Sequence, residues 1–216
     1  AETNVAFSSA NRVGNVEEAM AQCAAVVDEH FRVSVQKQMQ LEMQNALAYF
    51  SGDGKVTVWS PTQSPALAQR LVSWICDIPM SKVRIVNPGY VGGAFGVRIG
   101  LSGKAEIYAV ELARRTGKPV KLVYDRHEDM IASEARHSGK LHIQLGCDAQ
   151  GHLLALRGRG FMEAGAYALS SASLCGAMAS RMQTVYHIPH VDYLGQAVYT
   201  NTTPGGAQRG YGAPQP

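Results

Sequence analysis

Apolar residues recur at helical spacing in four segments of this chain. The first segment opens with a capping-box pattern, in which Asn15 is followed three residues later by Glu18. The second places a proline directly after Ser64, and the third ends at Gly117, a residue type that commonly terminates a helix. These signals predict helices over residues 15–27, 64–75, 105–116 and 170–184.

Extended segments fill much of the remaining chain. Apolar and polar residues alternate strictly from Lys140 to Leu145, which is typical of a strand with one buried face. Turn signals at residues 51–54 and 148–151 each join two such segments into a hairpin. Strands are predicted over residues 31–38, 46–50, 55–59, 83–86, 120–124, 140–145, 152–158 and 191–200. Hairpins mixed with packed helices, without regular strand–helix alternation, predict an α+β fold with mixed sheets.

The composition narrows the class of protein. The 216 residues are 46% hydrophobic and 17% charged, with a net charge of +3, as in an ordinary globular protein. Basic residues are scattered, so we expect no nucleic-acid partner. No apolar run approaches the roughly 20 residues that a membrane span needs. From the length, we expect one domain or half-domain over residues 1–216. We expect residues 1–13 to be loosely ordered.

The cysteines indicate a compartment. The four cysteines stand too far apart for a Cys-x-x-Cys metal pattern. Free, buried thiols in a reducing compartment are the simplest interpretation of this spacing. We therefore expect a cytoplasmic protein.

Two glycine-rich segments follow predicted strands. We call residues 88–96 the first glycine loop and residues 204–215 the second glycine loop. Glycine permits positive φ and a close approach of the backbone to a ligand, and successive free N–H groups form anion-binding concavities. The first loop lacks both the Gly-x-Gly-x-x-Gly order and a following Gly-Lys-Ser/Thr, so it fits neither a dinucleotide fold nor a phosphate loop. Two such loops favour a large, phosphorylated ligand held mainly by main chain.

Five segments in order resemble the molybdenum hydroxylases, the family of xanthine dehydrogenase and aldehyde oxidase. They are residues 60–65, 91–96, 111–120, 124–130 and 207–215. The resemblance runs from about Asn15 to the last residue, and it implies the first half of a subunit that binds a molybdenum–pyranopterin cofactor. Whether that cofactor carries a cytosine dinucleotide stays open. The abrupt start and end favour a fragment of a larger subunit or one product of a split gene.

The resemblance assigns cofactor contacts to Gln63, Gly92, Gly93, Ala94, Phe95, Gly96, Ala207, Gln208, Arg209 and Gly210. Gln63 matches a glutamine whose amide lies beside a terminal molybdenum ligand, although solvation at a helix entry is its alternative role. Arg209 matches an arginine of the second loop that either pairs with an anion or forms a plain surface ion pair. No side chain is expected to ligate the metal directly.

The catalytic base is expected outside this chain. In the family, a glutamate in a Gly-Glu-Pro context acts as general base, and this sequence has no such context. Four acidic residues, Asp125, Glu128, Asp129 and Glu134, are candidate replacements. They follow a predicted strand among basic residues, so a helix cap with surface ion pairs is preferred for them.

Three residues are expected in the substrate pocket: Tyr211, Ile99 and Ala177. Ile99 stands where purine-oxidising members carry a glutamate, and Ala177 stands where they carry an arginine. Tyr211 is equally well interpreted as a core tyrosine. Gly210 replaces the cysteine of carbon monoxide dehydrogenases. These departures favour an aldehyde or an aromatic N-heterocycle, hydroxylated with water-derived oxygen.

The resemblance also implies partners. They are the remaining half of the molybdopterin subunit, domains or subunits with iron–sulfur clusters and FAD, and a small-molecule substrate. The isolated chain is expected to be inactive, as part of a molybdenum-dependent oxidoreductase. Two alternatives remain, a purine hydroxylase and a non-catalytic cofactor-binding or assembly module on the same fold.

Overall fold

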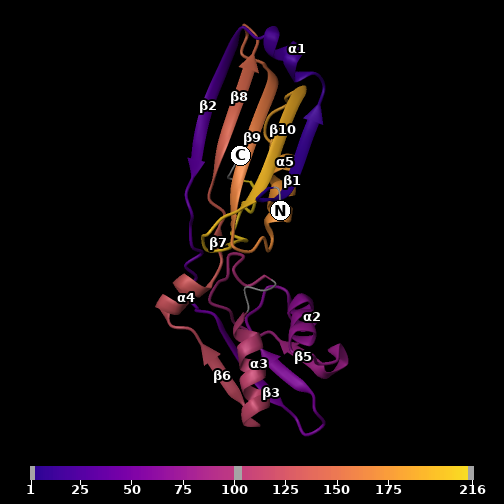
Figure 1. Cartoon of the computed structure of the whole chain (residues 1–216), viewed down its shortest axis with the longest axis vertical. Helices are drawn as coiled ribbons and strands as arrows, with labels where there is room; N and C mark the ends of the chain where they lie inside the picture. The colour runs from indigo at the N-terminus through magenta and orange to yellow at the C-terminus, as the bar shows by residue number, and fades with distance from the viewer. Residues whose placement is uncertain (1–2, 100–103, 214–216) are drawn as a thin grey trace. The chain divides into compact units, whose positions relative to one another are not determined.

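The computed structural model describes residues 3–99 and 104–213 (Figure 1). The chain divides into two compact units, one formed by Ala1–Gln36 with Ala135–Pro216 and the other by Lys37–Glu134. Both units combine helices with sheet, which confirms the predicted α+β class. A single family domain can comprise two compact units, so one domain over residues 1–216 stays a prediction. The last residues of the second glycine loop, 214 and 215, lie outside the described residues.

The unit Lys37–Glu134 is built on a four-stranded sheet in the order β5-β4-β3-β6. Its elements are β3 (Asn45–Phe50), β4 (Val56–Trp59), α2 (Pro65–Ile75), a 3-10 turn (Met80–Lys82), β5 (Val83–Val86), α3 (Lys104–Thr116), β6 (Val120–Val123) and α4 (Arg126–Ala132). Alternate residues of β3 and β4 are buried, and their alanines and valines pack with α2 and α3 into one core. The sheet and these two helices thus form two layers, and the first glycine loop follows β5.

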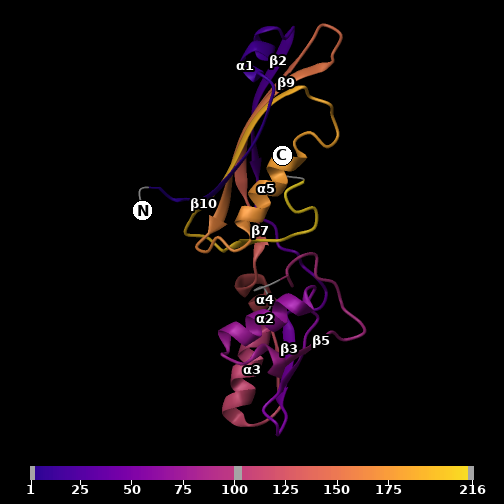
Figure 2. The same cartoon turned by 90° about the vertical axis from the view of Figure 1, so that its right-hand side faces the viewer.

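The other unit is built on a five-stranded sheet in the order β1-β10-β9-β8-β2. Its elements are β1 (Val5–Val13), α1 (Val16–Ala21), β2 (Ala25–Val33), β7 (Ala135–Arg136), β8 (Gly139–Cys147), β9 (Leu153–Gly165), α5 (Ser171–Arg181), β10 (His190–Tyr199) and β11 (Gly205–Gly206). Strands β9 and β10 are parallel, and the other neighbours in the sheet are antiparallel. Helix α5 lies along one face of this sheet (Figure 2) and closes a core that includes Leu174 and Met178.

Most predicted elements are present within a few residues of their expected bounds. Both predicted hairpins form, as β3–β4 and β8–β9. Pro65 begins α2 after Ser64, and Gly117 has φ of 63° just after α3. All four cysteines are free thiols, as predicted, although Cys23 and Cys147 are only half-buried. Within residues 3–99 and 104–213, no helix is both long and apolar enough to cross a membrane.

Three N-terminal predictions are wrong. The strand predicted over residues 31–38 instead begins at Ala25 and ends at Val33, as β2. Residues 5–13 are not loosely ordered, because β1 pairs along its length with β10, a strand nearly two hundred residues later. The first helix does not reach Val27 but ends at Ala21. Val27 instead belongs to β2, which pairs with Leu145 and its neighbours on β8. A long-range strand partner therefore overrides the local helical spacing.

Candidate functional site

The first glycine loop has a left-handed backbone at three places. Gly93, Phe95 and Gly96 have φ of 90°, 53° and 107°. A positive φ is unusual for a phenylalanine, because its Cβ crowds the backbone in this region. Within the described residues, the N–H groups of Gly93, Ala94 and Phe95 have no hydrogen-bond acceptor. Three successive unbonded donors fit a ligand rich in oxygen or negative charge.

The structure brings Gln63 onto this loop. Its side-chain Oε1 accepts a hydrogen bond of 3.0 Å from the Gly96 N–H. The orientation of the amide follows, because a backbone N–H is only a donor and requires the amide oxygen opposite it. The Nε2 hydrogens of the exposed Gln63 are then directed away from that bond and can donate to a ligand.

A buried arginine lies under the first loop. Arg98 is 2% exposed, and its Nη1 lies 2.9 Å from the Glu42 carboxylate. The same carboxylate oxygen of Glu42 accepts from the Gly92 N–H at 2.7 Å. Burial alone would raise the pKa of Glu42, but hydrogen bonds from Asn45, Gly92 and Arg98 lower it below its ordinary value. Glu42 is therefore a carboxylate, bonded to the middle of the loop at Gly92 and to Arg98 just after the loop.

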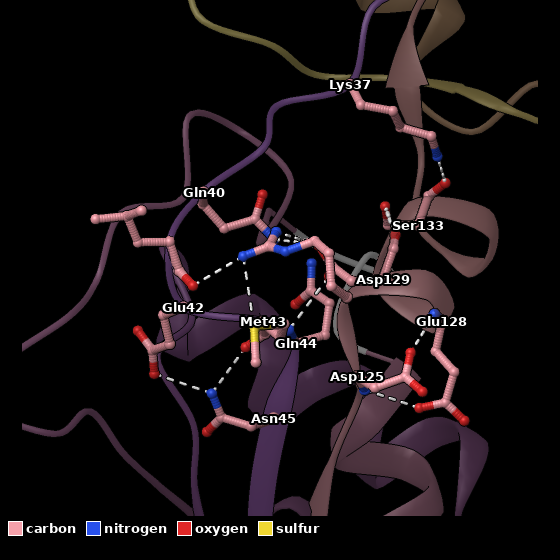
Figure 3. Close-up of polar contacts among 12 residues, drawn as sticks. Lys37, Gln40, Glu42, Met43, Gln44, Asn45, Asp125, Glu128, Asp129 and Ser133 are labelled. Carbon is pink, nitrogen blue, oxygen red and sulfur yellow. Dashed lines mark hydrogen bonds and ion pairs between the residues drawn. The ribbon is translucent and has the colours of Figure 1, made fainter.

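The acidic cluster after β6 has two different roles. Asp125 and Glu128 form the predicted cap of α4, each accepting from the other's backbone N–H (Figure 3). Asp129 does form an ion pair, with Arg126 at 3.4 Å, but the predicted surface location is wrong for its carboxylate, which is 2% exposed. Its carboxylate accepts from Gln40 Nε2 at 2.9 Å and from the Gln44 N–H at 3.2 Å (Figure 3). Asp129 is thus a structural hub for residues 40–44, and the helical spacing gave no sign of this burial.

Sequence reasoning missed Glu106. This side chain, in the first turn of α3, is 5% exposed, and its Oε1 accepts from the Ser60 hydroxyl. Burial raises the pKa of Glu106 to about 7, against the opposing effects of the Ser60 hydrogen bond and the Arg98 charge. An acidic residue in a first helical turn is usually a surface complement to the helix dipole, so the pattern carried no signal of burial.

The second glycine loop begins as a two-residue strand. Gly205 and Gly206 of β11 pair with β7, and the side chain of Arg136 on β7 reaches along the loop. Arg136 Nε donates to Gln208 Oε1 at 2.7 Å, and its Nη2 donates to the Arg209 carbonyl at 2.5 Å. These bonds orient two of the predicted cofactor residues.

The remaining predicted loop residues are accessible. Arg209 and Gly210 are exposed, and Ala207 and Gln208 are half-buried. Gly210 has φ of 78°, a backbone conformation that favours glycine. Within the described residues, no carboxylate pairs with Arg209. The surface ion pair considered for Arg209 is therefore not formed there.

A buried histidine, also missed from the sequence, supports the second loop. His137 is 1% exposed, and its Nε2 lies 2.9 Å from the Ser171 hydroxyl of α5. Burial lowers the pKa of His137 to about 4, so its ring is neutral at pH 7. A Cβ on Gly205 would stand 2.4 Å from the ring Cδ2, so only glycine fits above this histidine.

The three predicted pocket residues have different surroundings. The Tyr211 hydroxyl donates to the Ser170 carbonyl, and its ring packs against the core of its unit. The phenol is thus engaged within the unit, as a core tyrosine would be. Ala177 lies beside Gly212, whose added Cβ would stand 2.6 Å from the Ala177 Cβ. Ile99 is 42% exposed and belongs to the other unit, at the end of the first loop.

A family model described as the molybdopterin cofactor-binding domain matches residues 1–216. The chain belongs to the molybdopterin cofactor-binding domain family. This chain is 31% identical over 214 residues to the nicotinate dehydrogenase large molybdopterin subunit of Eubacterium barkeri. The match covers 99% of this chain and 50% of that subunit. This chain is 30% identical over 212 residues to the xanthine dehydrogenase molybdenum-binding subunit of Escherichia coli O157:H7, covering 98% and 28%.

Solved structures agree with this assignment. The aldehyde oxidoreductase from Desulfovibrio gigas superimposes with a TM-score of 0.91 at 27% identity, over 98% of this chain and 23% of that chain. The family predicted from the five sequence segments is therefore confirmed. This chain spans half or less of the length of each of these relatives.

Proposed function

We propose that this chain supplies part of the molybdenum–pyranopterin site of an oxidoreductase that hydroxylates an aldehyde or an aromatic N-heterocycle with water-derived oxygen. One observation carries the proposal: the Gln63 amide is oriented by the Gly96 N–H, which leaves its Nε2 hydrogens for a ligand. The unbonded N–H groups at Gly93, Ala94 and Phe95 lie in the same loop. This is a set of uncharged donors that suits an oxygen-rich, anionic cofactor.

The residues divide the work of binding. When bound, the cofactor supplies the two-electron redox chemistry and activates the water-derived oxygen. Gln63 Nε2 would donate to the bound cofactor beside the metal, and the main-chain N–H groups of residues 93–95 would donate to it as well. The N–H groups of Gly92 and Gly96 bond Glu42 and Gln63 instead, so these two glycines would serve through their close backbone approach. In the second loop, Ala207, Gln208 and Gly210 contribute main chain. The exposed Arg209 guanidinium pairs with a cofactor anion.

The residues at the three expected substrate positions favour an apolar or aromatic substrate. Ile99 and Ala177 have no hydrogen-bonding side-chain groups, so a purine would lose its polar anchors at about 1–3 kcal/mol each. The relatives include a nicotinate dehydrogenase subunit, whose name indicates an aromatic N-heterocycle as the substrate of that protein. Tyr211 contributes its ring to the pocket wall, since its hydroxyl is engaged by Ser170.

The remaining parts of the enzyme are also proposed. They are the rest of the molybdopterin subunit with the general-base glutamate, and domains or subunits with iron–sulfur clusters and FAD. The compartment is the cytoplasm, and the cofactor is molybdopterin with or without a cytosine dinucleotide. The isolated chain neither turns over substrate nor holds the cofactor tightly. Hydroxylase activity measured from residues 1–216 alone would contradict this part of the proposal.

The donor role of Gln63 is tested in the holoenzyme by comparing Gln63→Glu with Gln63→Ala. Glutamate still accepts from the Gly96 N–H but has no amide hydrogens to donate. We expect the kcat per bound molybdenum to fall about 10- to 100-fold in both variants, as is typical when a hydrogen-bond partner of a metal ligand is lost. Gln150→Ala, at an exposed turn, is the control.

A fully active wild-type enzyme that contains no molybdenum or pterin would refute the proposed function.

A further inference from the structure

Arg98 directs both terminal nitrogens of its guanidinium to partners in its own unit, while its buried Nε has no partner among the described residues. Besides the ion pair with Glu42, its Nη2 donates to the main-chain carbonyls of Glu42 and Met43, the latter at 2.9 Å. The Arg98 side chain is 2% exposed and that of Glu42 is 29% exposed, so the guanidinium is shielded from water and the carboxylate is partly so. Charge-assisted bonds in such a setting are the strongest hydrogen bonds that a side chain makes. The guanidinium thereby attaches the segment just after the first glycine loop to residues 42–43.

The main chain of Arg98 is a second point of attachment. Its carbonyl accepts from the Gln63 N–H at 3.1 Å and from the Thr62 hydroxyl at 3.3 Å. The turn that presents Gln63 is therefore hydrogen-bonded to the same residue that pairs with Glu42. A shift of Arg98 would move the backbone of Gln63 with it.

Glu42 holds the middle of the loop, at Gly92. Its carboxylate accepts from the Gly92 N–H at 2.7 Å, and its own N–H donates to the Gly92 carbonyl at 3.2 Å. The contact is tight, because a Cβ on Gly92 would stand 2.6 Å from the Glu42 Cβ. The unbonded N–H groups lie between these two attachment points. A segment fixed on both sides, at Gly92 and at Arg98, does not have to be ordered when a ligand binds.

We propose that Glu42 and Arg98 are positioning residues, which hold residues 92–96 and the Gln63 turn in the arrangement that receives the cofactor. This inference rests on the proposed function. Stability alone gives little reason to bury the Arg98 guanidinium, because buried charged groups are often no more stabilising than apolar residues of similar volume. Charge here has a geometric use, since one carboxylate bonds a guanidinium and a main-chain N–H in fixed directions.

The first test measures amide hydrogen exchange in the cofactor-free protein. In Glu42→Gln, the peptides that contain Gly92 and Gly96 should exchange about tenfold faster, since one charge-assisted bond is lost. Arg98→Lys keeps the charge but not the fork of donors, so it should exchange faster than wild type and more slowly than Arg98→Met. Glu111→Gln is the matched control, because it removes a carboxylate from the Glu111–Arg114 ion pair on α3. Unchanged exchange in Glu42→Gln overturns the inference.

The second test uses the holoenzyme. Glu42→Gln should lower the molybdenum content and also lower kcat per bound molybdenum, with KM for the organic substrate changed less than twofold. A purely structural role would reduce the yield of folded enzyme but leave kcat per bound molybdenum at the wild-type value, and that result overturns the inference. If the wild-type enzyme is active without molybdenum, the proposed function fails. The exchange measurement would still decide whether the pair holds the loop.

Discussion

The two glycine loops meet a similar backbone demand with different chemistry. The first loop is held by charge, since the buried Arg98 guanidinium pairs with the Glu42 carboxylate. The second loop is held by an arginine with neutral acceptors, because Arg136 bonds the Gln208 amide and the Arg209 carbonyl. Positive φ residues alone therefore do not specify how a glycine loop is fixed.

The groups buried near the two loops also differ. Glu106 belongs to the unit that carries the first loop, and burial raises its pKa to about 7. His137 belongs to the unit that carries the second loop, and burial lowers its pKa to about 4. Both groups prefer to be neutral, because a buried charge without a close partner loses its hydration. One is an acid and the other is a base, so they respond to pH in opposite directions. The two units should therefore lose stability at opposite ends of the pH range.

The largest expected effect comes from adding one methyl group to the second loop. Gly205→Ala places a Cβ 2.4 Å from Cδ2 of the His137 ring. Because this contact is overpacked, we expect the free energy of unfolding to fall by about 3 kcal/mol. Gly176→Ala is the matched control, since nothing lies within 4 Å of its added Cβ in α5. The control should gain about 0.5–1 kcal/mol from helix propensity. Equal urea midpoints for the two variants would disprove the rigid support by His137.

The next effect is the pH dependence of Glu106. Its folded pKa of about 7 lies above the ordinary value of 4.5, so unfolding releases a proton between these two values. The stabilisation is complete below pH 4.5 and is lost as the pH rises through about 7. We expect Glu106→Gln to be more stable than wild type by about 2–3 kcal/mol at pH 8, and equal to it near pH 4.5. Urea unfolding at both pH values measures this difference.

A variant on the same helix provides the control for Glu106. Glu111→Gln also removes a carboxylate from α3, but from a partly exposed position. It should change stability by no more than about 0.5 kcal/mol at either pH. A pH-independent gain in Glu106→Gln would show that packing, and not the buried charge, limits stability there.

His137 should show the opposite trend. Its folded pKa of about 4 lies below the ordinary value of 6.5, so the folded state resists protonation. The contribution is complete above pH 6.5 and is lost as the pH falls toward 4. Relative to His137→Gln, the wild type should lose about 1.4 kcal/mol per pH unit in this window. Parallel stability curves for the two proteins between pH 6.5 and 5 would contradict a buried neutral imidazole.

The smallest effect concerns Arg136, which holds the second loop through neutral acceptors. In Arg136→Lys a single ammonium replaces a fork that bonds both Gln208 and Arg209, so one bond is lost. We expect a loss of about 1 kcal/mol and faster amide exchange confined to the second loop. Arg12→Lys, at an exposed ion pair with Asp192, should change stability by less than about 0.5 kcal/mol. Equal losses in the two variants would remove the distinction between loop anchor and surface pair.

Elements with local signals were predictable from the sequence. The helix that begins at Pro65, the stop at Gly117 and the hairpin joining β3 to β4 depend on residues a few positions apart. Capping bonds and turn conformations form within such short segments, so their patterns survive in any tertiary setting. The two glycine loops belong to the same class, since a residue that tolerates positive φ is visible in the sequence itself.

The site depends on contacts that no local pattern records. Gln63 meets Gly96, and Glu42 meets Arg98, across separations that only the folded unit of residues 37–134 closes. Strand β1 is ordered by a partner at the far end of the chain, which is why its residues looked unstructured.

The sequence by itself determined the family, the α+β class and the positions of both glycine loops, because these follow from residue types and short spacings. Only the tertiary structure decided which carboxyls are buried and which atoms hold the loops. The reason is physical, since the burial of Glu106, Asp129 and His137 depends on what other segments pack over them. The first glycine loop is recognisable from its glycines, but its fixed shape comes from Arg98 and Glu42.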